Sequence, residues 1–253
     1  MNPKERVTAQ IQHIETDPVP YTLGFEGDVD LALDEYYGST DWRSKLRSAI
    51  VRIPIPMTGL QVDIEEGVEI AEREQYSDAY GSLWRMDCRP FHLEVPILKE
   101  PSLDDLHLPA PQSLFPDSWK TMARGFIEQY QDRFVVGAYG YGLFERSWTL
   151  RGFENMLMDC VIEEDFYDEL LETLTEHHLD LIDQLLELPV DGILLSDDWG
   201  YQHGVLIGAE RWRKMLKPRL ARLYQRVHDA GKIALNHCCG SVAEIMPDLI
   251  EIG

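Results

Sequence analysis

The chain has 253 residues, with 45 acidic and 23 basic side chains, and its formal net charge is −22. This charge argues against a protein that binds nucleic acid or an anionic membrane surface, because both partners need concentrated lysine and arginine. The hydrophobic share of 44% and the aromatic share of 10% are typical of a folded domain and not of a disordered acidic chain. At about 150 residues per domain, the length predicts one large domain or two small ones.

The sequence has no apolar run that approaches the roughly 18 residues of a membrane span. Its first residues also lack the apolar stretch of a signal peptide. Four cysteines are too few for a disulfide scaffold of this size, and the neighbours Cys238 and Cys239 are poorly placed to pair with each other. We therefore expect a cytoplasmic protein whose cysteines serve a metal or catalysis.

Short apolar runs along the chain predict strands. We expect strands at residues 19–25, 50–55, 134–139, 191–196 and 232–237, and a weaker one at 91–98. Residues 65–116 are rich in proline and acidic side chains with isolated aromatics. This composition predicts an irregular insertion or a hairpin within a single domain that spans residues 1–253.

Amphipathic stretches between these runs predict helices. Residues 164–188 carry apolar side chains three and four apart, which is the spacing of one helix face. A further helix is expected at residues 210–216, and another begins near Pro218. Ser241 and Glu244 have the spacing of a capping box, which predicts the start of a last helix.

The order of strands and helices from residue 133 onward predicts βαβ units and a parallel sheet. Two architectures fit this order, an open doubly wound sheet and a closed (β/α)8 TIM barrel. The stretch Phe25-Glu26-Gly27-Asp28 does not supply the glycine-rich phosphate loop of a dinucleotide-binding fold. A barrel places functional residues at the C-terminal ends of its strands, where the polar clusters of this sequence lie.

The stretch from Asn236 to Gly240 contains candidate metal ligands at a strand end. Side chains along a strand alternate, so His237 and Cys239 are expected on the same side and Cys238 toward the surrounding helices. Imidazole nitrogen and thiolate sulfur suit Zn²⁺. The alternative is a hydrogen-bonded histidine beside an inert buried thiol.

A second polar cluster follows the strand at 191–196 and spans residues 196–204. One of Asp197 and Asp198 is expected to face the barrel axis, and the other to cap the next helix or pair with an arginine. His203 is either a third metal donor or a surface histidine. Trp199 and Gln202 would form an aromatic and polar rim.

A third cluster, at residues 136–146, alternates glycine with larger side chains. Its glycines leave room for a ligand or for a close backbone. Tyr139 and Tyr141 share one face of an extended segment, and Glu145 next to Arg146 is a carboxylate beside a cation. The alternative is a glycine turn with a surface ion pair.

Several stretches are arranged as in a known family. They are residues 3–7, Asp17-Pro18-Val19-Pro20 before the first expected strand, residues 150–155 and 196–200, and His237-Cys238-Cys239-Gly240 followed by residues 247–251. In this order they resemble the uroporphyrinogen decarboxylase superfamily, in particular its methyltransferase-like branch. The resemblance extends over nearly the whole chain and implies a (β/α)8 barrel. It also implies that the chain ends before the last two βα units.

The resemblance further implies a function. Zinc methyltransferases of this branch move a methyl group between a thiol and a corrinoid (cobalamin) carried by a partner protein, and related demethylases take it from methoxylated compounds. By this resemblance His237 and Cys239 are zinc ligands. A third ligand, commonly a cysteine, comes from much nearer the C-terminus in the family, beyond Gly253 here.

We therefore expect a zinc-dependent methyltransferase that acts with a corrinoid protein on a small methylated or methoxylated substrate. Asp198 or Glu145 would handle a proton or orient the substrate. The expected substrate-binding residues are Tyr139, Tyr141, Trp199, Gln202 and His203.

Two other functions stay open. The first is uroporphyrinogen decarboxylation, which in the family uses arginines after the first strand to bind an acidic tetrapyrrole. This chain has Glu26, Asp28 and Asp30 there, which would repel such a substrate. The second is a non-catalytic, truncated barrel that only binds a corrinoid protein.

Overall fold

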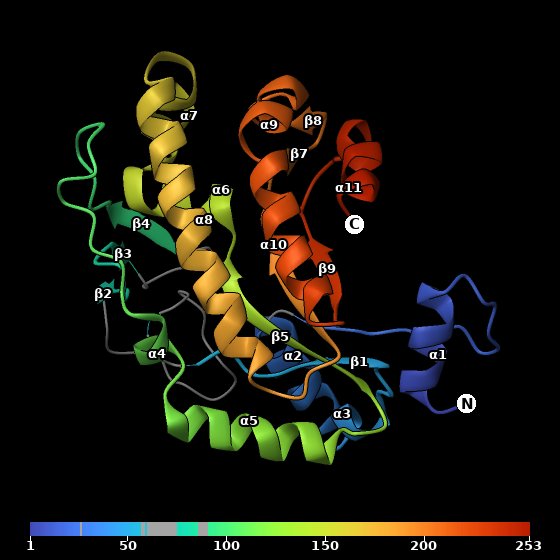
Figure 1. Ribbon diagram of the computed structural model, residues 1–253. Coiled ribbons are helices and arrows are strands. Elements are labelled where there is room, and N and C mark those ends of the chain that lie inside the picture. The colour runs from blue at the N-terminus through green and yellow to red at the C-terminus, as the bar shows by residue number, and fades with distance from the viewer. Residues whose placement is uncertain (26, 57–58, 60–74, 86–90) are drawn as a thin grey trace.

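The main sheet of the protein consists of four parallel strands in the order β1-β5-β6-β9 (Figure 1). The computed structural model describes residues 1–25, 27–56, 59, 75–85 and 91–253. The strands are β1 (Ile50–Arg52), β5 (Phe134–Tyr141), β6 (Gly192–Ser196) and β9 (Ile233–His237). Four of the predicted runs therefore form strands, and the predicted parallel α/β architecture is confirmed.

Side-chain alternation gives this sheet two different faces. Val135 and Tyr139 of β5 join the large core under the helices. Phe134 and Val136 point the other way and join a smaller cluster that includes Val7 of α1 (Pro3–Ile11). The helix-covered face therefore supplies most of the buried apolar residues, and the other face supplies a smaller cluster.

Helices α8 (Glu164–Leu186) and α10 (Lys217–Asp229) lie side by side across this sheet (Figure 1). The buried leucines of α8 recur three and four positions apart, which is why this helix could be predicted from periodicity. The remaining helices are α2 (Gly27–Tyr37), α3 (Trp42–Lys45), α4 (Pro111–Leu114), α5 (Asp117–Gln129), α6 (Leu143–Arg151), α7 (Phe153–Ile162), α9 (Ala209–Met215), η1 (Ala243–Ile245) and α11 (Met246–Ile252).

In the residues that the structure describes, β1 and β9 are the two edges of the main sheet and do not pair with each other. In the described residues the main sheet is therefore open and does not close into a barrel. No helix in the described part of the chain is both long enough and apolar enough to span a membrane.

The predicted strand at residues 19–25 is wrong. Val19 and Leu23 are exposed, and no strand forms there. The segment only runs beside the start of β1, where the Tyr21 carbonyl accepts from the Ala49 amide at 2.6 Å. Pro18 and Pro20 have no amide hydrogen to donate to a neighbouring strand, and this disfavours a strand in the segment.

The predicted capping box is also wrong. The Glu244 carboxylate accepts a hydrogen bond from the Val205 amide at 3.0 Å and does not cap its own helix. The helical segment begins with the short 3₁₀ turn η1, which has no side-chain cap. A tertiary contact therefore replaces the local one.

The predicted insertion at residues 65–116 is described only in part, because residues 65–74 and 86–90 lie outside the described residues. Its described part contains the antiparallel sheet β2-β3-β4. These strands are β2 (Gln75–Ser77), β3 (Leu83–Arg85) and β4 (His92–Val95), and β4 is the weaker strand predicted at 91–98. The single-domain division stays a prediction.

A buried histidine on α8 is expected to make the fold acid-sensitive. The Tyr80 hydroxyl lies 3.0 Å from Nε2 of His177. Burial, with His178 and Arg146 nearby, lowers the pKa of His177 to about 3. Histidine in an unfolded chain titrates near a pKa of about 6.5. Below that pH the unfolded state binds a proton that the folded state does not, so the unfolding free energy falls with the pH.

The variant His177→Gln keeps an acceptor for the Tyr80 hydroxyl and removes this titration. Near pH 5, we expect the slope of the unfolding free energy against pH to decrease by about 1.4 kcal/mol per pH unit, which corresponds to one proton. Urea unfolding at several pH values measures the slope. An unchanged slope in the variant would contradict the assignment.

Candidate metal centre

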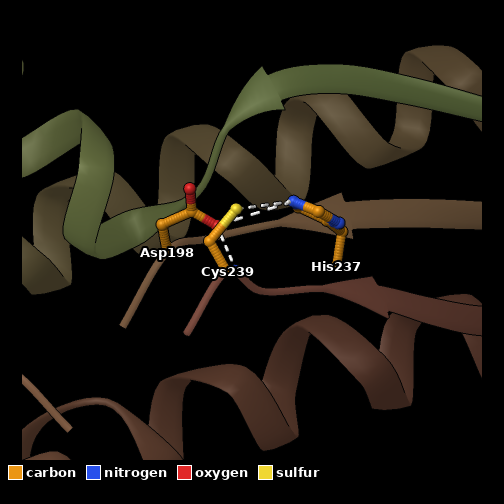
Figure 2. Close-up of side chains that lie close together, drawn as sticks. All are labelled: Asp198, His237 and Cys239. Atoms are coloured by element: carbon orange, nitrogen blue, oxygen red, sulfur yellow. Dashed lines mark hydrogen bonds and ion pairs between the residues drawn. The ribbon is translucent and has the colours of Figure 1, made fainter. Parts of the chain in front are cut away.

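The ends of two neighbouring strands bring three possible metal ligands together. His237 is the last residue of β9, Cys239 follows two positions later, and Asp198 follows the end of β6. β6 and β9 pair in parallel with Ser196 opposite His237, and the Asp197 amide donates to the His237 carbonyl at 3.1 Å. Figure 2 shows the three side chains pointing toward one another.

The distances within this group are short. The Cys239 sulfur lies 3.5 Å from Nε2 of His237, and the same nitrogen lies 3.6 Å from Oδ1 of Asp198. All three potential ligand atoms lie within 4.8 Å of one another. Oδ1 of Asp198 also accepts a hydrogen bond from the Cys239 amide at 2.7 Å.

This donor set suits zinc. Nitrogen, sulfur and carboxylate oxygen are its usual protein ligands, and a catalytic site combines three of them with an open position. His237 and Cys239 are exposed, so a ligand could approach from solvent. The expectation that both residues lie on one side is met, while their role as metal ligands stays a prediction.

Two glycines let the loops after β6 and β9 pack backbone against backbone. A Cβ atom on Gly200 would lie 2.6 Å from the Cys239 carbonyl oxygen. A Cβ atom on Gly240 would lie 2.4 Å from the Gly200 carbonyl carbon, and Gly240 has a φ of +77°. The Ser241 amide donates to the Tyr201 carbonyl at 2.7 Å across this contact. These glycines position Cys239, and sequence reasoning missed their role.

Asp197 serves the fold while Asp198 faces the site. The Asp197 carboxylate, 2% exposed, accepts hydrogen bonds from the Phe144 and Glu145 amides at the start of α6, at 3.0 and 2.8 Å. It also accepts from Nε1 of Trp199 at 2.7 Å. Burial raises the pKa of Asp197 to about 7 despite these three donors. The two aspartates do have different roles, but Asp197 caps α6, which precedes it in the chain, and not the next helix as predicted.

Glu145, a predicted catalytic residue, lies in the first turn of α6 beside both aspartates. Burial raises its pKa to about 9, and the carboxylates of Asp197 and Asp198 add to the rise. A hydrogen bond with the backbone of Asp198 acts in the opposite direction. The structure thus brings Glu145 next to the candidate metal centre.

The alternative interpretation, a surface ion pair between Glu145 and Arg146, is wrong. Arg146 is 1% exposed, and its guanidinium lies 3.7 Å from the centre of the Tyr80 ring. Nη1 of Arg146 also lies 3.7 Å from Oδ2 of the buried Asp78. Successive helix residues point in different directions, which is why Glu145 faces the site and Arg146 the core.

Two predicted substrate-binding residues need correction. Tyr139 and Trp199 are each 1% exposed and belong to the core. Tyr139 packs edge-on against His178 at 5.0 Å between ring centres, and Trp199 packs against Trp212 at 5.5 Å. The helix-covered face of the sheet takes up both aromatic side chains, so neither is open to a substrate in this structure.

The other predicted substrate-binding residues lie nearer the surface. Tyr141, partly buried, stacks against Trp84 with 6.2 Å between ring centres. Gln202 and His203 are exposed in the turn between β7 (Gly200–Tyr201) and β8 (Gly204–Val205). His203 is not among the grouped donor atoms found in the described residues, and its ring lies against Tyr201 instead.

Cys238 turns away from the site, as expected. Its sulfur accepts a hydrogen bond from the Trp199 amide at 3.2 Å and packs against the core. Burial raises the pKa of this thiol to about 11. Cys238 therefore stays a thiol at neutral pH, and Cys239 is the cysteine that faces the site.

Residues 137–253, which contain the whole candidate centre, match the uroporphyrinogen decarboxylase (URO-D) family. The resemblance to the uroporphyrinogen decarboxylase superfamily is thereby confirmed for these residues. No curated protein sequence matches the chain significantly. Among solved structures, a methyltransferase from Methanosarcina mazei matches with a TM-score of 0.72 and 19% identity, over 100% of this chain and 74% of that chain. At this identity the likeness shows the fold, and it agrees with the fold expected for the superfamily.

Proposed function

We propose that the protein is a zinc-dependent methyltransferase that transfers a methyl group between a small methylated or methoxylated substrate, or a thiol, and a corrinoid carried by a partner protein. The observation that carries this proposal is the 3.5 Å distance between Nε2 of His237 and the Cys239 sulfur at the C-terminal end of β9. The solved methyltransferase of the same fold supports it. We further propose that the protein acts in the cytoplasm.

In this proposal His237 and Cys239 hold the metal. Zinc bound there would lower the pKa of a coordinated thiol, or polarise the oxygen of a methyl ether. Glu145 would hold or deliver the proton, because its carboxyl group lies beside Asp198 at the start of α6. Tyr141, Gln202 and His203 are the predicted substrate-binding residues that stay accessible.

Metal analysis tests this function first. The wild type is expected to bind one zinc ion per chain, and the double variant His237→Ala, Cys239→Ser to bind none under the same conditions. Both side chains are exposed, so the variant is expected to unfold at nearly the wild-type urea concentration. Equal zinc content in the two proteins would refute the ligand assignment.

An activity assay then distinguishes the reactions. Thiol-dependent demethylation of methylcobalamin, followed by its absorbance change, is expected in the zinc-loaded wild type and not in the double variant. The second candidate, uroporphyrinogen decarboxylation, is favoured by the name of the matching family. Zinc-independent release of carbon dioxide from uroporphyrinogen would favour it instead. Binding of a corrinoid protein without methyl transfer would favour a non-catalytic role.

A further inference from the structure

We infer that Asp198 is a direct ligand of the metal, so that β6 and β9 together supply a three-residue His-Cys-Asp site. This inference rests on the proposed function, because it needs a metal at His237 and Cys239. It assigns Asp198 to the metal and leaves proton handling to Glu145. The sequence predicts a proton-handling or substrate-orienting role for Asp198, and the family resemblance implies a third metal ligand beyond Gly253.

The first argument is the direction of the contacts. A carboxylate that only orients a metal-bound histidine contacts the ring nitrogen that faces away from the metal. Here Oδ1 of Asp198 and the Cys239 sulfur both face the same nitrogen, Nε2 of His237. Oxygen, sulfur and nitrogen therefore face one another, as Figure 2 shows, and lie within 4.8 Å of one another.

The second argument is size. With the usual zinc bond lengths, a tetrahedron separates nitrogen from sulfur by about 3.6 Å and nitrogen from oxygen by about 3.4 Å. The corresponding distances in the protein are 3.5 Å and 3.6 Å. An ion could therefore enter this group with only small side-chain movements.

The third argument is charge and support. One thiolate and one carboxylate together balance the two positive charges of Zn²⁺, and the neutral imidazole adds none. The Asp198 carboxylate is already held by the Cys239 amide through Oδ1, at 2.7 Å. The loop after β9 thus orients the ligand that the loop after β6 would supply.

Zinc affinity of single variants tests the inference, measured by competition with a chromophoric chelator. Asp198→Asn is the decisive variant, because its amide oxygen can still accept from the Cys239 amide but is a much poorer zinc ligand. We expect Asp198→Asn and Asp198→Ala to lower the affinity by more than about a hundredfold, which exceeds the roughly 10–100-fold loss typical of a residue that only orients a metal ligand. His107→Ala, which removes an exposed histidine outside the group, is the matched control and should bind as the wild type does.

Cobalt substitution gives a second readout. With Co²⁺ bound, the near-ultraviolet thiolate band from Cys239 should persist in Asp198→Asn, while the visible ligand-field bands should shift in position and intensity. If Asp198→Asn binds zinc with wild-type affinity and keeps the wild-type cobalt spectrum, Asp198 only positions the loop and the inference is overturned. In that outcome a loss of zinc in His237→Ala would leave the proposed function intact. A wild type that binds no zinc would overturn both.

Discussion

Replacing Asp197 with alanine is expected to lower the unfolding free energy by about 3 kcal/mol or more, because it leaves three buried donors without an acceptor. These donors are the Phe144 and Glu145 amides and Nε1 of Trp199. The same carboxylate joins the start of α6 to the end of β6, so its loss should also loosen the loop that carries Asp198. Urea denaturation measures the change.

The neighbouring carboxylate provides the matched control. Asp198 is partly exposed and accepts a hydrogen bond from the Cys239 amide, so Asp198→Ala should cost about 1 kcal/mol or less. Asp197→Asn should fall between, because its amide keeps one acceptor oxygen but turns a donor toward the remaining amides. If Asp197→Ala and Asp198→Ala destabilised the protein equally, the distinct role of Asp197 would be disproved.

Replacing Gly240 with alanine is expected to damage both stability and metal binding. The new Cβ atom would lie 2.4 Å from the Gly200 carbonyl carbon, which is backbone and cannot swing away. The loop after β9 would have to move, and Cys239 moves with it. We expect a fall of at least about tenfold in zinc affinity, as for other disturbances around metal ligands.

Gly231 offers a control with the same backbone strain and no steric conflict. Its φ is +69°, against +77° for Gly240, and a Cβ atom there would meet nothing within 4 Å. Gly231→Ala should therefore cost about 1 to 2 kcal/mol of stability through φ alone and leave zinc affinity unchanged. Urea unfolding of the two variants measures the loss of stability caused by backbone strain. Chelator competition measures the loss of zinc affinity that is expected only where the loop carrying Cys239 is displaced. Equal zinc affinities in both would contradict the proposed role of Gly240.

The sequence by itself determined the regular elements and one side-by-side pair of possible ligands. The three long parallel strands and α8 follow from local periodicity, because the buried side of an element repeats every two or about 3.6 residues. The same period of two placed His237 and Cys239 on one side of β9. No knowledge of distant residues was needed for these predictions.

The tertiary structure decided which residues meet across elements. It separated Asp197 from Asp198, brought Asp198 to His237 and moved Tyr139 and Trp199 into the core. It also left residues 19–25 outside the main sheet, although their apolar run resembles that of a strand. These outcomes depend on the register of β6 against β9 and on the close approach of two glycine loops. Such contacts join residues some 40 positions apart in the chain, and a local pattern carries no information about them.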